Sequence, residues 1–151
     1  NKKAKVNEIT PVIVVENPEK IKGKTALLIG DGPTLTHGGM KHGVADYIAE
    51  KYKLKIIDAE KYAVGSIKQL YKEFTHLKKV LPAMGYNKKQ VQELQETINK
   101  AKCEIVIDGS PSNLKNFIKT NKLIYNADYD ILDKELKEVY NEVNKVLKWK
   151  I

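Results

Sequence analysis

Residues 30–43, GDGPTLTHGGMKHG, combine the residue types that bind small anions and move protons. The stretch holds five glycines, two threonines, an aspartate and two histidines. Glycine lets backbone N–H groups come close to a ligand, and hydroxyl and imidazole groups can hydrogen-bond a phosphoryl group or shuttle a proton. An equally weighted alternative is that these side chains only satisfy the backbone of the loop. We predict a catalytic role for His37 and ligand-binding roles for Asp31, Gly32, Thr34, Thr36, Gly38, Gly39 and Lys41.

The same stretch does not match the phosphate loops of nucleotide-binding proteins. Gly38 and Gly43 have the glycine spacing of a Walker A loop, but residues 44–45 are Val-Ala where that loop has Lys and Ser or Thr. The dinucleotide-binding fingerprint fails because Leu35 stands in place of its third glycine. His37 and His42 do not share one helix face, as paired zinc ligands do. We therefore expect neither nucleotide hydrolysis by these residues alone nor a metal site built on these two histidines.

The positions of apolar residues predict a chain in which strands alternate with helices. Strands are expected at 24–29, 54–58, 104–107 and 122–126, and helices at 40–52 and from residues 66, 87, 110 and 133 onward. Residues 12–15 are expected to form an edge strand or a connecting arm. Residues 80–86 are interpreted as a packed apolar loop. This order predicts an α/β protein, a three-layer Rossmann-like sandwich with a mostly parallel sheet of about four to five strands. Residues 24–151 form a single α/β domain in this prediction, and residues 1–23 are an N-terminal arm or the end of a preceding nucleotide-binding domain.

Three strand-to-helix turns are expected to converge at one edge of the parallel sheet, where open α/β sheets bind ligands. The first lies within residues 30–39, and the other two supply further predicted ligand-binding residues: Gly65, Ser66, Asp108, Gly109 and Ser110. Ser66 is expected to cap a helix together with Gln69, and Ser110 to cap another that begins at Pro111. Backbone N–H groups at such helix starts favour an anion. Asp31 and Asp108 could hold Mg²⁺ or a hydroxyl group, or could simply cap helices, and the sequence supports both interpretations equally.

Charge and composition exclude several classes of protein. The chain of 151 residues has a net charge of +8, but all 27 of its basic residues are lysine, and many alternate with acidic residues, as in 134–138. Because base recognition and bidentate phosphate binding favour arginine, we expect no specific nucleic-acid partner. No apolar run is long enough to cross a membrane, no secretory signal is visible, and a single cysteine excludes an internal disulfide. These features favour a cytoplasmic protein, and a first residue other than Met leaves open whether the chain is part of a longer one.

Four longer strings make the chain similar to a known family. They are residues 30–41 (GDGPTLTHGGMK), 62–67 (YAVGSI), 76–86 (HLKKVLPAMGY) and 96–99 (ETIN). On these motifs the chain resembles, over about residues 1–129, the C-terminal part of the family that contains cyclic 2,3-diphosphoglycerate synthetase and its predicted GTPase relatives. It departs from the family pattern at Gly30, where the family usually has Glu, and at Ser110, where it tends to have Thr. It also departs within 125–129, where the family tends to carry an Arg.

The resemblance implies the C-terminal module of an ATP- or GTP-dependent phosphoryl-transfer enzyme. The nucleotide, with Mg²⁺, would be held by an upstream P-loop domain of the full-length protein, and no cofactor is expected within this chain. In this interpretation the module binds a small phosphorylated or other anionic ligand, and a homo-oligomer is left open. The competing interpretation is a non-catalytic interaction domain whose glycine-rich loop packs against the P-loop domain.

Overall fold

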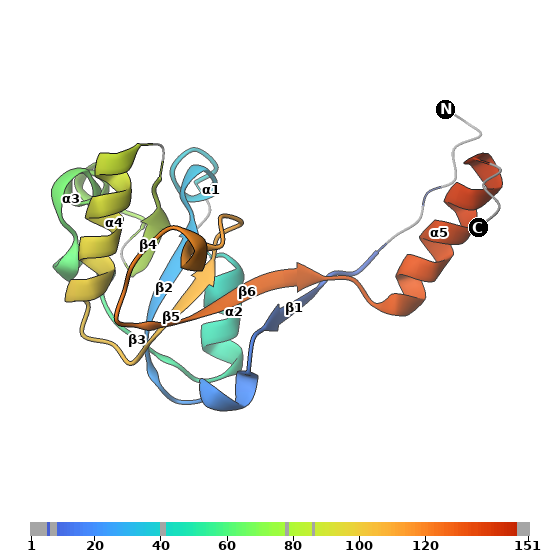
Figure 1. Cartoon of the computed structure of the whole chain (residues 1–151), viewed down its shortest axis with the longest axis horizontal. Helices are drawn as coiled ribbons and strands as arrows, with labels where there is room; N and C mark the ends of the chain where they lie inside the picture. Colours follow the sequence, from blue (N-terminus) through green and yellow to red (C-terminus); the bar gives the residue numbers. More distant parts are fainter. Residues whose placement is uncertain (1–5, 7–8, 40–41, 78, 86, 148–151) are drawn as a thin grey trace.

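The computed structural model describes residues 6, 9–39, 42–77, 79–85 and 87–147. Their centre is a sheet with the strand order β1-β6-β5-β2-β3, in which β4 also pairs with β2 (Figure 1). The strands are β1 (Val12–Val15), β2 (Thr25–Asp31), β3 (Lys55–Ile56), β4 (Val80–Ala83), β5 (Ile105–Gly109) and β6 (Leu123–Asp130). Among the described residues, each pairing is parallel except that of β1 with β6. This confirms the predicted Rossmann-like α/β fold with a mostly parallel sheet.

The central strands β2 and β5 are buried on both faces, as their continuous apolar runs predicted. The residues from Ala26 to Ile29 and from Ile105 to Ile107 are 0% exposed, which is typical of parallel strands covered by helices on both sides. β5 occupies one edge of β2, from Ala26 to Gly30. Two strands pair with the other edge of β2: β3 with its first residues and β4 with its last.

Helices cover the two faces of the sheet. α2 (Val44–Lys51) packs against β1, β2, β5 and β6 through a buried stripe that includes Ile48. α3 (Gly65–Glu73) and α4 (Lys88–Lys100) pack against each other on the other side, with Ile67 and Leu94 in the core (Figure 1). Three 3₁₀ helices lie in the connections: η1 (Pro18–Lys20), η2 (Ala59–Tyr62) and η3 (Leu114–Asn116).

The last helix, α5 (Asp133–Leu147), stands apart from these layers. It follows β6 and lies at the opposite end of the molecule from α3 and α4 (Figure 1). Four apolar side chains in it or just before it are exposed: Leu132, Tyr140, Val143 and Leu147. The helix predicted from residue 133 is confirmed, and the described residues of the chain leave much of its apolar side uncovered.

Three local predictions differ from the structure near the sheet edge. Residues expected in the glycine-rich loop form the short helix α1 (Gly32–Thr36), because the Asp31 carboxylate accepts hydrogen bonds from the first turn. The helix predicted at 40–52 begins only at Val44, and Met40 and Lys41 lie outside the described residues. The expected packed loop contains strand β4, in which Pro82 is tolerated because this strand pairs with β2 alone among the described strands.

The turn after β5 is also built differently from its prediction. Ser110 does not begin a helix, because its N–H and hydroxyl groups both donate to the carboxylate of Asp108. The next helical residues are those of η3, whose N-cap is Asn113. By contrast, the predicted start of α4 is confirmed, since the side chain of Asn87 accepts a hydrogen bond of 3.0 Å from the N–H of Gln90.

Candidate functional site

A crevice opens beside the carboxyl ends of β2 and β5, where the order of the strands reverses. From β2 the chain runs through α2 to β3 on one side, whereas β5 and β6 lie on the other, and open α/β sheets bind ligands at such a point. The cavity has a volume of about 300 Å³. Its lining comes from five parts of the chain: Gly30, Asp31, Thr34 and Leu35, then His42 to Asp46, then Val80, then Gly109 to Pro111, and finally Ala127 to Tyr129.

Asp31, at the end of β2, holds the first turn of α1. Its Oδ2 atom accepts hydrogen bonds from the N–H of Thr34, at 3.1 Å, and from the hydroxyl of Thr34. Both bonds fall on Oδ2, so Oδ1 has no hydrogen-bond partner among the described residues. The carboxylate therefore caps its own helix, as one of the two sequence interpretations proposed, and keeps one oxygen available to a ligand in the crevice.

The start of α2 brings a second carboxylate to the crevice. Asp46 accepts a hydrogen bond of 2.8 Å from the N–H of Gly43, and its other oxygen lies 4.0 Å from Nδ1 of His42. α2 approaches β5 closely here because Gly109 has no side chain: a Cβ at this position would lie 2.9 Å from the backbone nitrogen of Ala45. The glycine therefore positions Asp46 by allowing its helix to pack tightly.

The buried carboxylate of Asp108 organises the turn after β5. Asp108 is 1% exposed. One of its oxygens accepts the N–H and the hydroxyl of Ser110, at 3.0 and 2.7 Å, and the other accepts the N–H of Leu114 at 2.9 Å. Asp108 does not line the cavity, but these bonds position Ser110 and Pro111, which do. Its role in the described structure is to shape one wall of the crevice.

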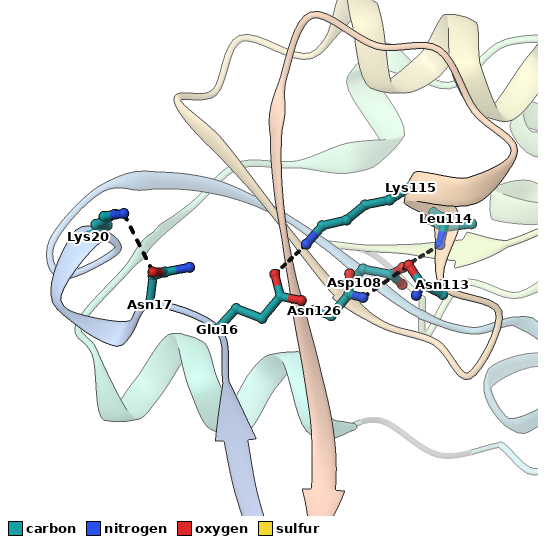
Figure 2. A network of polar contacts seen from close by, with 8 residues as sticks. All are labelled: Glu16, Asn17, Lys20, Asp108, Asn113, Leu114, Lys115 and Asn126. Atoms are coloured by element: carbon teal, nitrogen blue, oxygen red, sulfur yellow. Dashed lines mark hydrogen bonds and ion pairs between the residues drawn. The ribbon is translucent and has the colours of Figure 1, made fainter.

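The same turn is tied to one end of the β1–β6 pair, next to the pairing of Val15 with Ala127 (Figure 2). Oδ1 of Asn113 accepts a hydrogen bond of 3.0 Å from Nδ2 of Asn126 on β6, and Lys115 forms an ion pair with Glu16, which follows β1. The Oδ1 atom of Asn126 is buried and has no hydrogen-bond partner among the described residues. None of these four side chains lines the crevice, so their contacts serve to fix the turn rather than to face a ligand.

The charges around the crevice are mainly negative. Three aspartates, Asp31, Asp46 and Asp128, are among its lining residues, together with His42. Although the chain has 27 lysines, none of them belongs to the described lining. Acidic walls attract a cationic group and repel a free phosphate, because charges of one sign focus their potential in a concave site. The described lining therefore favours a cationic group, whereas the turns predicted an anion site.

The structure brings four of the predicted ligand-binding residues to the crevice: Asp31, Thr34, Gly109 and Ser110. The other described ones lie outside its lining: Gly32, Thr36, Gly38, Gly39, Gly65, Ser66 and Asp108. His37, the predicted catalytic residue, also lies outside it. The hydroxyl of Thr36 donates to the carbonyl of Gly32 at 2.9 Å, and the exposed His37 donates its backbone N–H to the carbonyl of Pro33 at 2.8 Å. These two contacts are of the kind expected if the loop only satisfies its own backbone. Lys41 lies outside the described residues.

The turn at residues 63–66 does not reach the crevice, and a carboxylate of the protein itself fills its helix start. Glu93 on α4 accepts the N–H of Ser66 at 3.0 Å and also its hydroxyl, so the predicted capping box with Gln69 does not form. The hydroxyl bond from Ser66 holds the pKa of Glu93 below its ordinary value. Gly65 adopts a φ of +53°, which favours glycine, and a Cβ there would collide with the Glu93 carboxylate. The predicted convergence of three turns is therefore wrong for this one.

Sequence reasoning did not assign four of the polar residues that line the crevice: His42, Asp46, Asp128 and Tyr129. Asp46 stands in the first turn of a helix, where an acidic residue commonly complements the helix dipole and so gives no separate signal. Asp128 and Tyr129 lie within 125–129, where the chain departs from the family that it resembles. That departure was the signal that could have identified this wall of the site.

Two further features are absent from the described residues. These residues contain no group of three or more His, Cys, Asp or Glu side chains arranged to hold a metal ion. Among their helices, none combines the length and the apolar character that crossing a membrane requires. The half-buried Cys103 lies away from the crevice lining, and burial raises the pKa of its thiol.

Comparison with known proteins identifies a similar but much longer enzyme. The chain is 48% identical to arginine synthetase ArcE of Thermococcus kodakarensis over 146 residues. The match covers 94% of this chain and 33% of that protein, so the chain spans about a third of the length of its relative. No family model matches the chain, and no solved structure matches it.

Proposed function

We propose that this chain is one domain of a longer synthetase that makes arginine, and that its crevice receives the cationic group of the amino acid. The observation that carries the proposal is the acidic lining, with Asp31, Asp46 and Asp128 around a cavity of about 300 Å³. The substrate class comes from the similarity to arginine synthetase ArcE. An arginine side chain ends in a planar guanidinium whose N–H donors pair with carboxylates, often through two parallel hydrogen bonds.

The departure from the resembled family supports the same assignment. That family tends to carry an Arg within the segment that corresponds to residues 125–129, and this chain has Asp128 in the crevice wall there. An arginine suits a phosphorylated ligand, whereas an aspartate suits a cationic one. The change of charge at this wall is what a change of ligand from a phosphate ester to arginine would require.

The remaining parts of the reaction would belong to the rest of the longer protein. Val44 stands at the position where a Walker A loop has its lysine. ATP or GTP with Mg²⁺ would therefore be held by an upstream P-loop domain, and the crevice would present the amino acid to it. More specifically, we propose a phosphoryl-transfer reaction of the type performed by cyclic 2,3-diphosphoglycerate synthetase. In that reaction this domain and the nucleotide-binding domain would together bind a small phosphorylated ligand.

Titration with arginine tests the proposal on the 151-residue chain. Arginine is expected to shift the backbone amide resonances of Gly109, Ser110 and Asp128 in a saturable way. Norvaline, which has the same backbone and no guanidinium, is the matched control ligand and should leave them unchanged. Asp128→Asn should weaken arginine binding about tenfold, since losing one partly solvated charge pair costs about 1.4 kcal/mol. Glu96→Gln, an exposed change on α4, should have no effect.

Two results would refute the proposal. Equal shifts with norvaline and arginine would show that the guanidinium is not recognised. Unchanged arginine affinity in Asp128→Asn, with the fold intact by amide spectra, would show that the acidic wall does not bind the ligand.

A second candidate function is a non-catalytic interaction domain, which the exposed apolar side of α5 favours. Tyr140, Val143 and Leu147 are between 43% and 64% exposed, and such a side is commonly buried against another helix. In this case arginine shifts no resonance of the crevice. Val143→Glu, which leaves the crevice untouched, would instead reduce self-association measured by sedimentation velocity.

A further inference from the structure

A second cavity lies next to the crevice and includes a lysine, which the described lining of the crevice lacks. Its volume is about 470 Å³, and its polar lining consists of His42, Asp46, Thr75, His76 and Lys79. It shares His42 and Asp46 with the crevice, so the two cavities adjoin at the start of α2. His76 and Lys79 belong to the string HLKKVLPAMGY, of which Val80 but neither of these two residues lines the crevice.

The imidazole of His76 is held in one orientation. Its Nε2 atom lies 2.8 Å from the carbonyl oxygen of Leu35 in α1. Because a carbonyl oxygen can only accept, Nε2 carries the proton of this bond. The ring also meets the ring of Phe74 edge to face, with their centroids 6.1 Å apart. Because these two contacts already hold the ring in place, binding a ligand to it would cost little further side-chain entropy.

Two groups in this cavity can donate hydrogen bonds to a ligand. Lys79 has an exposed ammonium group and no ion pair among the described residues, and Thr75 supplies a hydroxyl. The one carboxylate, Asp46, already accepts the N–H of Gly43 at 2.8 Å and lies 4.0 Å from the imidazole of His42. An imidazole that already donates through Nε2 can donate from Nδ1 only as the imidazolium, the form that pairs with a phosphate anion.

We propose that this cavity is a phosphoryl-binding subsite, in which Lys79, His76, His42 and Thr75 hold the oxygens of a phosphate group. Donors from several directions suit a tetrahedral phosphate, which has more acceptor oxygens than a planar carboxylate. The subsite lies directly beside the acidic crevice, so a phosphoryl group and a cationic amino acid would be bound next to each other. It rests on its own residues and does not require that arginine binds the crevice.

Inorganic phosphate is the probe for this subsite, and the 151-residue chain at constant ionic strength is the sample. Phosphate should shift the amide resonances of Thr75 and His76 and the ring resonances of His42, with a dissociation constant of about 1 mM. Lys79→Ala, a change at an exposed position, should weaken binding about tenfold. Lys61→Ala is the matched control, because Lys61 is equally a surface lysine but lies outside the cavity and pairs with Asp58 at 3.6 Å.

His76→Gln is the second variant, since the amide of glutamine can still donate to the carbonyl of Leu35 but cannot become positively charged. It should also weaken phosphate binding, with the amide spectrum of α1 preserved. A parallel titration with ATP separates the two sources of the phosphoryl group. Tighter binding of ATP at the same residues identifies a nucleotide, and equal binding of ATP and phosphate identifies a phosphorylated substrate.

Either of two outcomes would overturn the assignment. Phosphate shifts that do not saturate at tenfold higher concentration would show that no site is present. The same affinity in Lys79→Ala, Lys61→Ala and the unchanged chain would show that phosphate binds elsewhere. Both results are independent of the arginine titration, because the probes and the variant residues differ.

Discussion

Replacing Asp108 by asparagine removes a buried charge that holds the wall of the crevice. Asp108 is 1% exposed and accepts three hydrogen bonds, two from Ser110 and one from the N–H of Leu114. An asparagine side chain keeps one oxygen, so it can retain the pair from Ser110. Its NH₂ group must then face the N–H of Leu114, which loses its acceptor.

The expected loss follows from these three bonds. One charge-assisted hydrogen bond, of about 1.5–3 kcal/mol, disappears, and the other two become weaker neutral bonds. Relief of the cost of burying a charge offsets part of this loss. We therefore expect Asp108→Asn to lower the free energy of unfolding by about 2–3 kcal/mol, which for a chain of this size corresponds to about 5–10 °C in Tm.

Urea unfolding followed by circular dichroism measures this difference, provided that the slope m is unchanged. Ser110→Ala should cost about 1 kcal/mol, because it removes one of the three bonds. Asp128→Asn, at an exposed aspartate of the same crevice, should change stability by less than about 0.5 kcal/mol. If Asp108→Asn were as stable as the unchanged chain, the turn after β5 would not depend on this carboxylate, and the reasoning would be refuted.

Three further predictions concern stability, all measured by urea unfolding. The lowered pKa of Glu93 means that its stabilisation is present above the ordinary glutamate pKa and lost as pH falls through the folded-state value. The loss of unfolding free energy caused by Glu93→Gln should therefore become smaller as the pH falls. A loss that does not change with pH, or the same pH dependence in Glu96→Gln, would contradict this. Gly65→Ala should lower the free energy of unfolding by at least about 1–2 kcal/mol. The loss should exceed that of Gly23→Ala, because a Cβ at Gly23 meets open space at a φ of +71°. Equal losses would show that a Cβ at residue 65 does not collide with Glu93. Tyr71→Phe removes a buried 2.8 Å hydrogen bond to a β4 carbonyl and should cost about 1 kcal/mol, whereas no loss would show that bond to be dispensable.

The elements that local sequence determines were predicted well. β2 and β5 are continuous apolar runs, and such runs are stable only where both faces are covered. The start of α4 follows from Asn87, whose side chain can reach the N–H three residues later. In each case the signal and the contact lie within a few residues of each other.

Contacts between distant residues account for the failures. Ser66 has the local pattern of a capping box, but its hydroxyl binds Glu93, 27 residues away in the sequence. The run at 80–83 contains a proline and resembles a loop, and only its pairing with β2 makes it a strand. The acidic crevice arises because Asp31, Asp46 and Asp128, which belong to three separate elements, meet at one edge of the sheet. No spacing along the chain predicts that meeting.

The separation of α5 from the sheet has a consequence for how the chain responds to heat and to deuterated solvent. A helix of 15 residues is near the length at which an unsupported helix is only marginally stable in water. Its amide hydrogens should therefore exchange through local fraying, whereas those of β2 and β5 should exchange only when the whole sheet opens. Amide exchange would then occur on two separate timescales. On warming, the helical signal of α5 would decrease before the sheet unfolds.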